Sequence, residues 1–327
     1  MKKLLFYLLV LFIYVDVHAQ TSLDAVLQGT IINAKSNYIE IKYLNNPLDD
    51  SLSSITVDLN EKGQFYFELP IKRPLDAQIH LNNQYVSFYI EPSERLEVSI
   101  LADDVMRSAS FTADVYNNLF LIEYRKKYDR ARNVNDRNKH IINDDADAYT
   151  KYEDVLALDQ LKFLSDFQKE FKLSKTFVKR QIAVIKYGAA NRKYKFKSSA
   201  KTLANIDKEL PANYYSFVDS FTVDDNNLIT VPEFYEFLEY RFDYHFKNLP
   251  YKATNELEEI SYIYNTAHSL YKDRVQNIFL TKKFGEILDQ YSYEYSSRFI
   301  SNYMSTVYTN EYRAYIDKKI IKAKSKN

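Results

Sequence analysis

Apolar and polar residues alternate with a period of two along the first third of the chain, up to about Thr112. Segments rich in asparagine, proline or glycine, such as 45–47 and 60–63, separate the alternating runs. Short alternating strands divided by turn signals predict an antiparallel β-sandwich-like domain. The predicted strands are 26–32, 38–43, 55–59, 64–69, 77–81, 85–90 and 96–101.

From about Asp114 the apolar residues instead recur at the spacing of a helix face. Leu161, Leu164 and Phe167 follow one another at steps of three, for example. Side chains three and four residues apart share one side of an α-helix, so this period predicts helices with one buried face. No fixed repeat of about 30 to 50 residues is present, and we therefore expect irregular helical packing rather than a regular solenoid.

One helix start is marked by its residues. Thr230 is followed three positions later by Glu233, with Pro232 between them, and this spacing is typical of a capped first turn. With the change of period near residue 113, the pattern predicts an α+β protein. Its β-domain spans 20–113 and an irregular all-helical domain spans 114–327.

The first residues resemble a secretory signal peptide. Lys2 and Lys3 precede an unbroken apolar run over 4–15, and Val17-His18-Ala19 places small residues at the positions that signal peptidase recognises. The apolar run is shorter than the roughly 20 residues of a membrane-spanning helix. We expect cleavage after Ala19 and export to the periplasm or the outer part of the envelope, with no membrane span after cleavage.

The composition excludes several classes of function. The chain has no cysteine, so a thiol cannot act as a nucleophile and disulfides cannot stabilise the fold. Lysine plus arginine equals aspartate plus glutamate, 44 each, which leaves no net field that would attract nucleic acid. The four glycines are too scattered to form a phosphate-binding loop. The 30 tyrosines supply large side chains that pack through the ring and still reach water through the hydroxyl.

Six aromatic residues recur at helical spacing near the end of the chain. Ordinary packing explains such a stripe, because tyrosines on a helix usually bury their rings and keep their hydroxyls wet. The alternative is that part of the stripe stays exposed and forms a partner surface, which the basic tail after Asp317 would help to attract. The residues are Tyr291, Tyr295, Phe299, Tyr303, Tyr308 and Tyr312.

Three segments of the first half, Leu27-Gln28-Gly29, 57–67 (VDLNEKGQFYF) and 88–98 (FYIEPSERLEV), follow a recognisable plan. They resemble the β-domain that precedes a thioredoxin module in bacterial envelope thiol-disulfide interchange proteins. The helical part, including 223–228, resembles the segment between the two modules of those proteins. The family usually has Pro-Gly-Asp where this chain has Pro92-Ser93-Glu94. Because its redox module depends on a Cys-x-x-Cys pair, the resemblance implies the scaffold without that module.

Candidate catalytic, cofactor-binding and metal-binding residues are not identified by the sequence. His245 and His268 could meet between helices, but neither belongs to a His-Glu-x-x-His motif, and packing explains such histidines more simply. The acidic segment 143–147 lacks the glycine and the distal glutamate of a calcium loop and is better explained as a helix cap.

We therefore expect an exported, non-catalytic envelope binding or scaffold protein that needs no cofactor and whose partner is another envelope protein. Two alternatives remain open. One is an enzyme that uses paired carboxylates in a cleft between the two parts, and the other is the non-catalytic half of a split thiol-disulfide system.

Overall fold

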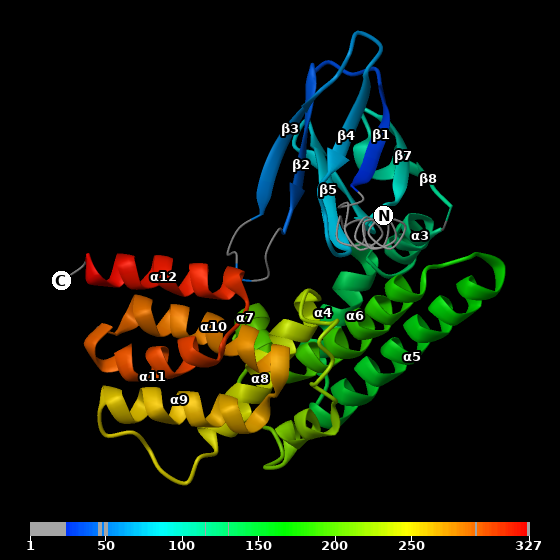
Figure 1. Ribbon diagram of the computed structural model, residues 1–327. Helices are drawn as coiled ribbons and strands as arrows, with labels where there is room; N and C mark the ends of the chain where they lie inside the picture. Colours follow the sequence, from blue (N-terminus) through cyan, green and yellow to red (C-terminus); the bar gives the residue numbers. More distant parts are fainter. Residues whose placement is uncertain are drawn as a thin grey trace, which may run out of the picture. The chain divides into compact units, whose positions relative to one another are not determined.

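The computed structural model describes residues 24–44, 48, 52–114, 116–129, 131–291 and 293–325. Within these residues eight strands form two four-stranded sheets (Figure 1). The first sheet has the order β4 (Gln64–Leu69), β1 (Ala25–Ile32), β7 (Arg95–Leu101), β8 (Ser110–Thr112). The second has the order β3 (Ser53–Asp58), β2 (Tyr38–Tyr43), β5 (Leu75–Leu81), β6 (Gln84–Ile90). The expected signal peptide lies outside the described residues.

The two sheets share one hydrophobic core. Leu27 and Ile31 of β1 pack in the same cluster as Ile41 of β2 and Ile79 of β5. Along β1 these inward residues alternate with less buried ones such as Gln28, which is the pattern that a strand with one buried face requires. The sandwich that the alternation predicted is confirmed.

One strand pair departs from the antiparallel arrangement. β1 pairs with β4 in the antiparallel direction but with β7 in parallel, and the other described pairs are antiparallel. Alternation of side chains reports which face of a strand is buried, but it does not report the direction of the neighbouring strand. The short helix α2 (Val105–Ser108) and the strand β8 were not predicted either.

Helices make up the second part of the chain, and they complete the predicted α+β fold. The chain divides into two compact units, one of residues 1–45 and 51–121 and one of residues 46–50 and 122–327. The helices are α3 (Asn117–Tyr128), α4 (Ala131–Asn143), α5 (Ala146–Glu170), α6 (Lys175–Tyr194), α7 (Phe196–Ala204), α8 (Pro232–Lys247), α9 (Glu256–Leu270), α10 (Asp273–Gln290), α11 (Tyr293–Thr306) and α12 (Asn310–Lys324), with the 3₁₀ helix η1 (Tyr214–Ser220) before α8.

Short-range signals start several of these helices. Asp145 accepts a hydrogen bond from the Ala148 amide at 2.8 Å at the start of α5, as the helix-cap interpretation of 143–147 predicted. α8 does begin at Pro232, but Thr230 does not cap it, because its hydroxyl and carbonyl oxygens instead accept hydrogen bonds from the Arg180 guanidinium. The start of α8 was therefore predicted correctly and its capping residue was not.

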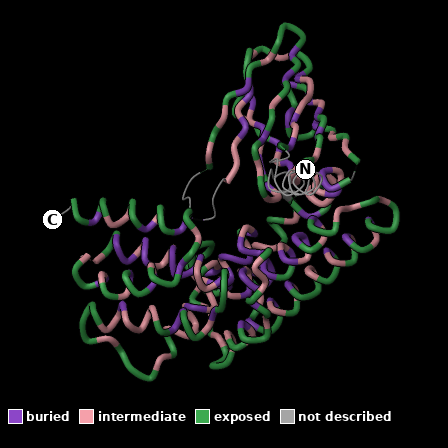
Figure 2. Tube along the Cα trace, viewed as in Figure 1, coloured by how far each residue is buried: buried purple, intermediate pink, exposed green. Residues whose placement is uncertain are grey.

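Buried aromatic rings hold the helical unit together, and the buried positions face its interior (Figure 2). The Tyr187 ring of α6 lies 5.0 Å from the Phe234 ring and 5.2 Å from the Phe237 ring of α8. Its hydroxyl donates a hydrogen bond to the Thr222 carbonyl. Burying the ring while bonding the hydroxyl is the use that the abundant tyrosines predict. Along the described residues, no helix is long and apolar enough to cross a membrane.

Candidate functional site

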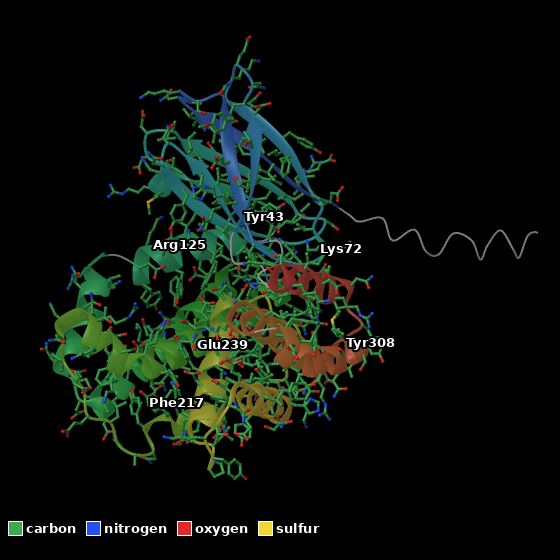
Figure 3. The ribbon with its side chains drawn as sticks, turned by 90° about the vertical axis from the view of Figure 1, so that its left-hand side faces the viewer. Tyr43, Lys72, Arg125, Phe217, Glu239 and Tyr308 are labelled. Atoms are coloured by element: carbon green, nitrogen blue, oxygen red, sulfur yellow. The ribbon has the colours of Figure 1, made fainter. Side chains whose placement is uncertain are left out.

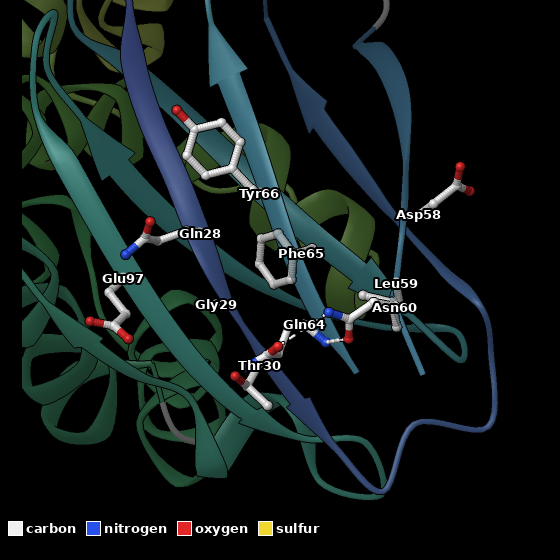
Figure 4. Close-up of a pocket in the computed structure, with 10 residues that line it drawn as sticks. All are labelled: Gln28, Gly29, Thr30, Asp58, Leu59, Asn60, Gln64, Phe65, Tyr66 and Glu97. Carbon is white, nitrogen blue, oxygen red and sulfur yellow. Dashed lines mark hydrogen bonds between the residues drawn. The ribbon is translucent and has the colours of Figure 1, made fainter. Parts of the chain in front are cut away.

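Side chains on the outer face of the first sheet line an open hollow of about 580 Å³ (Figure 4). They come from β4, β1 and β7, from Asp58 at the end of β3 and from the turn between β3 and β4, all within the β unit. This face points away from the sandwich core, because its residues occupy the polar positions of the alternating pattern. The residues that matter below are Gln28, Thr30, Asn60, Gln64, Tyr66 and Glu97.

The strand register places three of these side chains in one row. Gln28 lies opposite Tyr66 on β4 and opposite Glu97 on β7. Neighbouring strands are about 4.8 Å apart, so the row carries an aromatic ring, an amide and a carboxylate at that spacing. A second row, with Thr30 opposite Gln64, lies two residues further along β1.

The polar groups at the centre of the hollow have unused hydrogen-bonding capacity. Within the described residues the side chains of Gln28, Thr30 and Glu97 make no hydrogen bond and no ion pair. Together they offer amide donors, a hydroxyl, and amide and carboxylate acceptors. The hollow can therefore exchange water for the polar groups of a ligand without breaking an internal bond of these three side chains.

Tyr66 is held in place at one side of the row. Tyr66 is 54% exposed, and its hydroxyl donates a hydrogen bond to Glu68 Oε1 at 2.7 Å. That hydrogen bond is the main reason why the pKa of Tyr66 is raised above its ordinary value, so the phenol stays protonated. The result is a flat, exposed ring whose orientation is restrained by its own polar end.

The turn between β3 and β4 forms the rim. The Asn60 side-chain oxygen accepts hydrogen bonds from the amides of Lys62 and Gln64, both at 2.9 Å. Its amide nitrogen donates to Gln64 Oε1 at 3.1 Å (dashed in Figure 4). Gly63 has φ +72°, a conformation that other residues rarely adopt. Turn geometry thus positions Gln64 at the edge of the hollow.

Gly29 allows the floor of the hollow to form. A Cβ atom at this position would lie 2.1 Å from the carbonyl oxygen of Val98 on β7. Only a residue without a side chain permits β1 and β7 to approach so closely. The spacing between Gln28 and Glu97 therefore depends on this glycine.

The charged residues that line the hollow are acidic, and Arg95 of β7 lies close enough to Tyr66 to influence its pKa. Asp58 and Glu97 are among its lining residues, and the described lining includes no lysine, arginine or histidine. Figure 4 shows the two carboxylates on opposite sides, with β4 and β1 between them and Asp58 directed away from the hollow. They do not form the facing pair that two-carboxylate catalysis needs.

The predicted aromatic stripe does not form one continuous surface. Tyr303 and Tyr312 are buried in the helical core, and Tyr291 and Phe299 pack partly against it. Tyr295 and Tyr308 are exposed, at 48% and 86%, and Tyr308 lies at the edge of the helical unit (Figure 3). The two buried tyrosines are core residues and cannot belong to an accessible partner surface.

Helix geometry explains how the stripe is split. Tyr295, Phe299 and Tyr303 follow one another in α11 at steps of four, and each step turns about 40° beyond a full rotation. Successive rings therefore move from solvent toward the core. Tyr308 lies outside both helices, in the connection between α11 and α12, and has no helical face.

Four carboxyl groups elsewhere have a pKa raised by burial, namely Glu94, Asp129, Glu233 and Glu239. None of the four lines the hollow. Asp129 and Glu233 are both influenced by Arg192, which donates a hydrogen bond to the fully buried Glu153 at 2.9 Å. Glu94 lies in the β unit and Asp129 is exposed, whereas Glu233 and Glu239 lie on α8 of the helical unit.

The two histidines considered as metal ligands, His245 and His268, take ordinary partners in the helical unit. His245 contacts the Asp219 carboxylate at 2.8 Å, and His268 stacks on the Tyr264 ring. In the part of the chain that the structure describes, no group of three or more histidine, aspartate or glutamate side chains is arranged to hold a metal ion.

Comparison with protein-family models, with curated proteins and with solved structures finds no match to this chain. The candidate site therefore depends on the geometry alone. The sequence pattern predicted the three strands that carry Gln28, Tyr66 and Glu97, but it singled out none of these residues. The pattern could not indicate that these residues form one row, because strand order and register join residues up to 69 positions apart.

Proposed function

We propose that this chain is an exported, non-catalytic binding protein of the cell envelope, and that the hollow on the β unit is its recognition site. The observation that supports the proposal most directly is the row of Tyr66, Gln28 and Glu97, in which a restrained ring stands beside polar groups with free hydrogen-bonding capacity. A ligand site needs a concave surface with a few placed polar groups, and the hollow has both.

The lining chemistry favours binding over catalysis. The lining side chains include no thiol, amine or imidazole, and the two carboxylates do not face each other. The carboxyl groups whose pKa is raised, which would be the first candidates for a general acid, lie outside the hollow. This is the reason for preferring a binding protein to the alternative of a cleft enzyme with paired carboxylates.

Site-specific photocrosslinking in the host cell tests the proposal. A benzophenone amino acid replaces Gln64 at the rim of the hollow, and in a matched control it replaces Thr56, which is also exposed but lies on the other sheet. Benzophenone inserts into C–H bonds of protein, glycan and lipid alike, so it does not presuppose the ligand. We expect an adduct from position 64, no adduct from position 56, and recovery of the chain from the envelope fraction.

A second variant makes the experiment specific to the hollow. Adding Gln28→Ala and Glu97→Ala to the position-64 probe should abolish the adduct while the chain still folds. Equal labelling from positions 64 and 56, or labelling that survives the double substitution, would contradict the proposal. Turnover of the captured molecule by the purified chain would favour the enzyme alternative instead.

A further inference from the structure

The polarity of the hollow limits what can bind there. Of its lining side chains only Tyr66 presents an exposed aromatic surface, because Phe65 is buried in the sandwich core. Gln28, Thr30 and Glu97 are polar and unbonded within the described residues. A protein epitope is usually centred on several apolar anchors. The hollow instead suits a ligand that is covered with hydrogen-bonding groups and has one small apolar face.

The charge of the hollow limits the ligand further. Asp58 and Glu97 line it and Glu68 holds the Tyr66 hydroxyl, while the described lining has no cationic side chain. Phosphate, nucleic acid and acidic glycans would meet the Glu97 carboxylate inside the hollow, and like charges at short distance repel, while Arg95 acts on Tyr66 from outside the lining. A ligand that is uncharged where it contacts Glu97 fits this lining.

The position of the hollow on the sheet argues against an extended peptide. A peptide that adds a strand binds the backbone groups at a sheet edge. The row of Tyr66, Gln28 and Glu97 lies across the face of β4, β1 and β7, and the backbone of β1 is already paired on both sides. β4 is the edge strand of this sheet, but Gln28 and Glu97 lie on the inner strands β1 and β7 and can reach a ligand only through their side chains.

We propose, building on the binding role above, that the ligand is a neutral saccharide, with one sugar ring stacked on Tyr66 and its hydroxyl groups bonded to Gln28 and Glu97. Sugar hydroxyls donate to the Glu97 carboxylate and accept from the Gln28 amide, and the apolar C–H face of the ring covers the tyrosine. Side chains on adjacent strands stand about 4.8 Å apart, a spacing comparable to the width of one pyranose ring.

Calorimetric titration of the full chain tests this assignment. The probes are soluble neutral hexasaccharides, namely maltohexaose, cellohexaose, xylohexaose and chitohexaose in its N-acetylated form, with oligogalacturonate as the acidic control. Each is added up to about 10 mM, at which millimolar affinities are still measurable. We expect at least one neutral hexasaccharide to bind and the acidic one not to bind.

Variants locate the binding. Tyr66→Ala should weaken the affinity about tenfold or more, because the stacking surface is lost. Tyr66→Phe, which keeps the ring, should weaken it less. Tyr85→Ala is the matched control, because Tyr85 is 45% exposed on β6 of the other sheet and should not affect the affinity. Unchanged thermal unfolding of Tyr66→Ala shows that the loss is local.

The possible results separate this proposal from the one it rests on. Absence of binding by every neutral hexasaccharide, stronger binding of the acidic one, or binding that is insensitive to Tyr66→Ala would overturn the saccharide assignment. If the position-64 photoprobe then captures a peptide, the hollow is still a recognition site and only the ligand class is wrong. If the photoprobe captures nothing, both proposals fall.

Discussion

The side chain of Asn118 pairs with the backbone of Tyr89 as a neighbouring strand would. The Tyr89 amide donates to Asn118 Oδ1 at 2.7 Å, and Asn118 Nδ2 donates to the Tyr89 carbonyl oxygen at 2.8 Å. Tyr89 belongs to β6, which is the last strand of its sheet, and both residues are buried. Unpaired backbone groups at a sheet edge attract other strands, so this asparagine satisfies and covers the edge of β6.

Asn118→Ala should destabilise the β unit by about 2–4 kcal/mol, because a buried amide and a buried carbonyl both lose their partners. Hydrogen–deuterium exchange of the Tyr89 amide measures the effect directly and should become faster. The exposed strand substitution Thr56→Ala serves as the control and should leave both stability and exchange unchanged. Slow exchange at Tyr89 in the Asn118 variant would show that another group protects this edge.

Two glycine-to-alanine substitutions should differ strongly in their effect. Gly29→Ala places a Cβ 2.1 Å from the Val98 backbone oxygen, so β1 and β7 must separate, and we expect a loss of about 2–4 kcal/mol in the free energy of unfolding. In Gly188→Ala the nearest atom is the end of the flexible Arg192 side chain at 3.2 Å. The free energy of unfolding of Gly188→Ala should stay within about 1 kcal/mol of the wild-type value, because alanine favours the helix more than glycine does. Urea unfolding of both variants measures this difference, and equal losses of stability would contradict the prediction.

Serine substitutions at two tyrosines of the predicted stripe should also differ strongly in their effect on stability. The Tyr303 ring lies 5.4 Å from the Phe284 ring, and its hydroxyl donates a hydrogen bond to the Asn277 carbonyl. Tyr303→Ser should therefore lower the free energy of unfolding by about 3–5 kcal/mol. Tyr308 is 86% exposed, and Tyr308→Ser should change the stability by less than about 0.5 kcal/mol. Thermal unfolding of the two variants measures this difference. Similar melting temperatures would mean that Tyr303 is not a core residue.

Glu233 should make the stability depend on pH. Burial raises the pKa of its carboxyl group above the ordinary value of 4.5, against the opposing effect of Arg180, and its Oε2 atom is buried without a hydrogen bond. The folded chain therefore holds this proton more tightly than the unfolded chain. Its contribution to the free energy of unfolding falls as the pH rises from about 4.5 through the raised pKa.

Glu233→Gln removes that titration, so the variant should be more stable than the wild type at pH 7 and should lose this advantage below about pH 4.5. Urea unfolding at several pH values between 4 and 7 is the measurement. Glu294→Gln, at an exposed position of α11, is the matched control and should follow the wild-type curve. Parallel curves for the wild type and Glu233→Gln would show that the buried carboxyl does not contribute.

The local properties of the chain could be determined from the sequence alone. Alternation along 38–43 and 64–69 gave the strands and their buried faces, and the helical period gave the helical part, because both depend on side chains that are close in sequence. The start of α8 at Pro232 is also a local property, since proline suits the first turn of a helix. The absence of thiol chemistry followed from composition.

Only the tertiary structure decided the properties that depend on distant residues. The parallel pairing of β1 with β7 brings Gln28 opposite Glu97, and no pattern within either strand reports it. Likewise, Thr230 bonds to Arg180, 50 residues away, instead of capping its own helix. The aromatic stripe also shows that sequence spacing does not determine burial. Spacing places Tyr295 and Tyr303 on related faces of one helix, but only packing against other helices determines which ring is buried. The hollow on the β unit is made by such long-range register, and for that reason the sequence pattern did not reveal it.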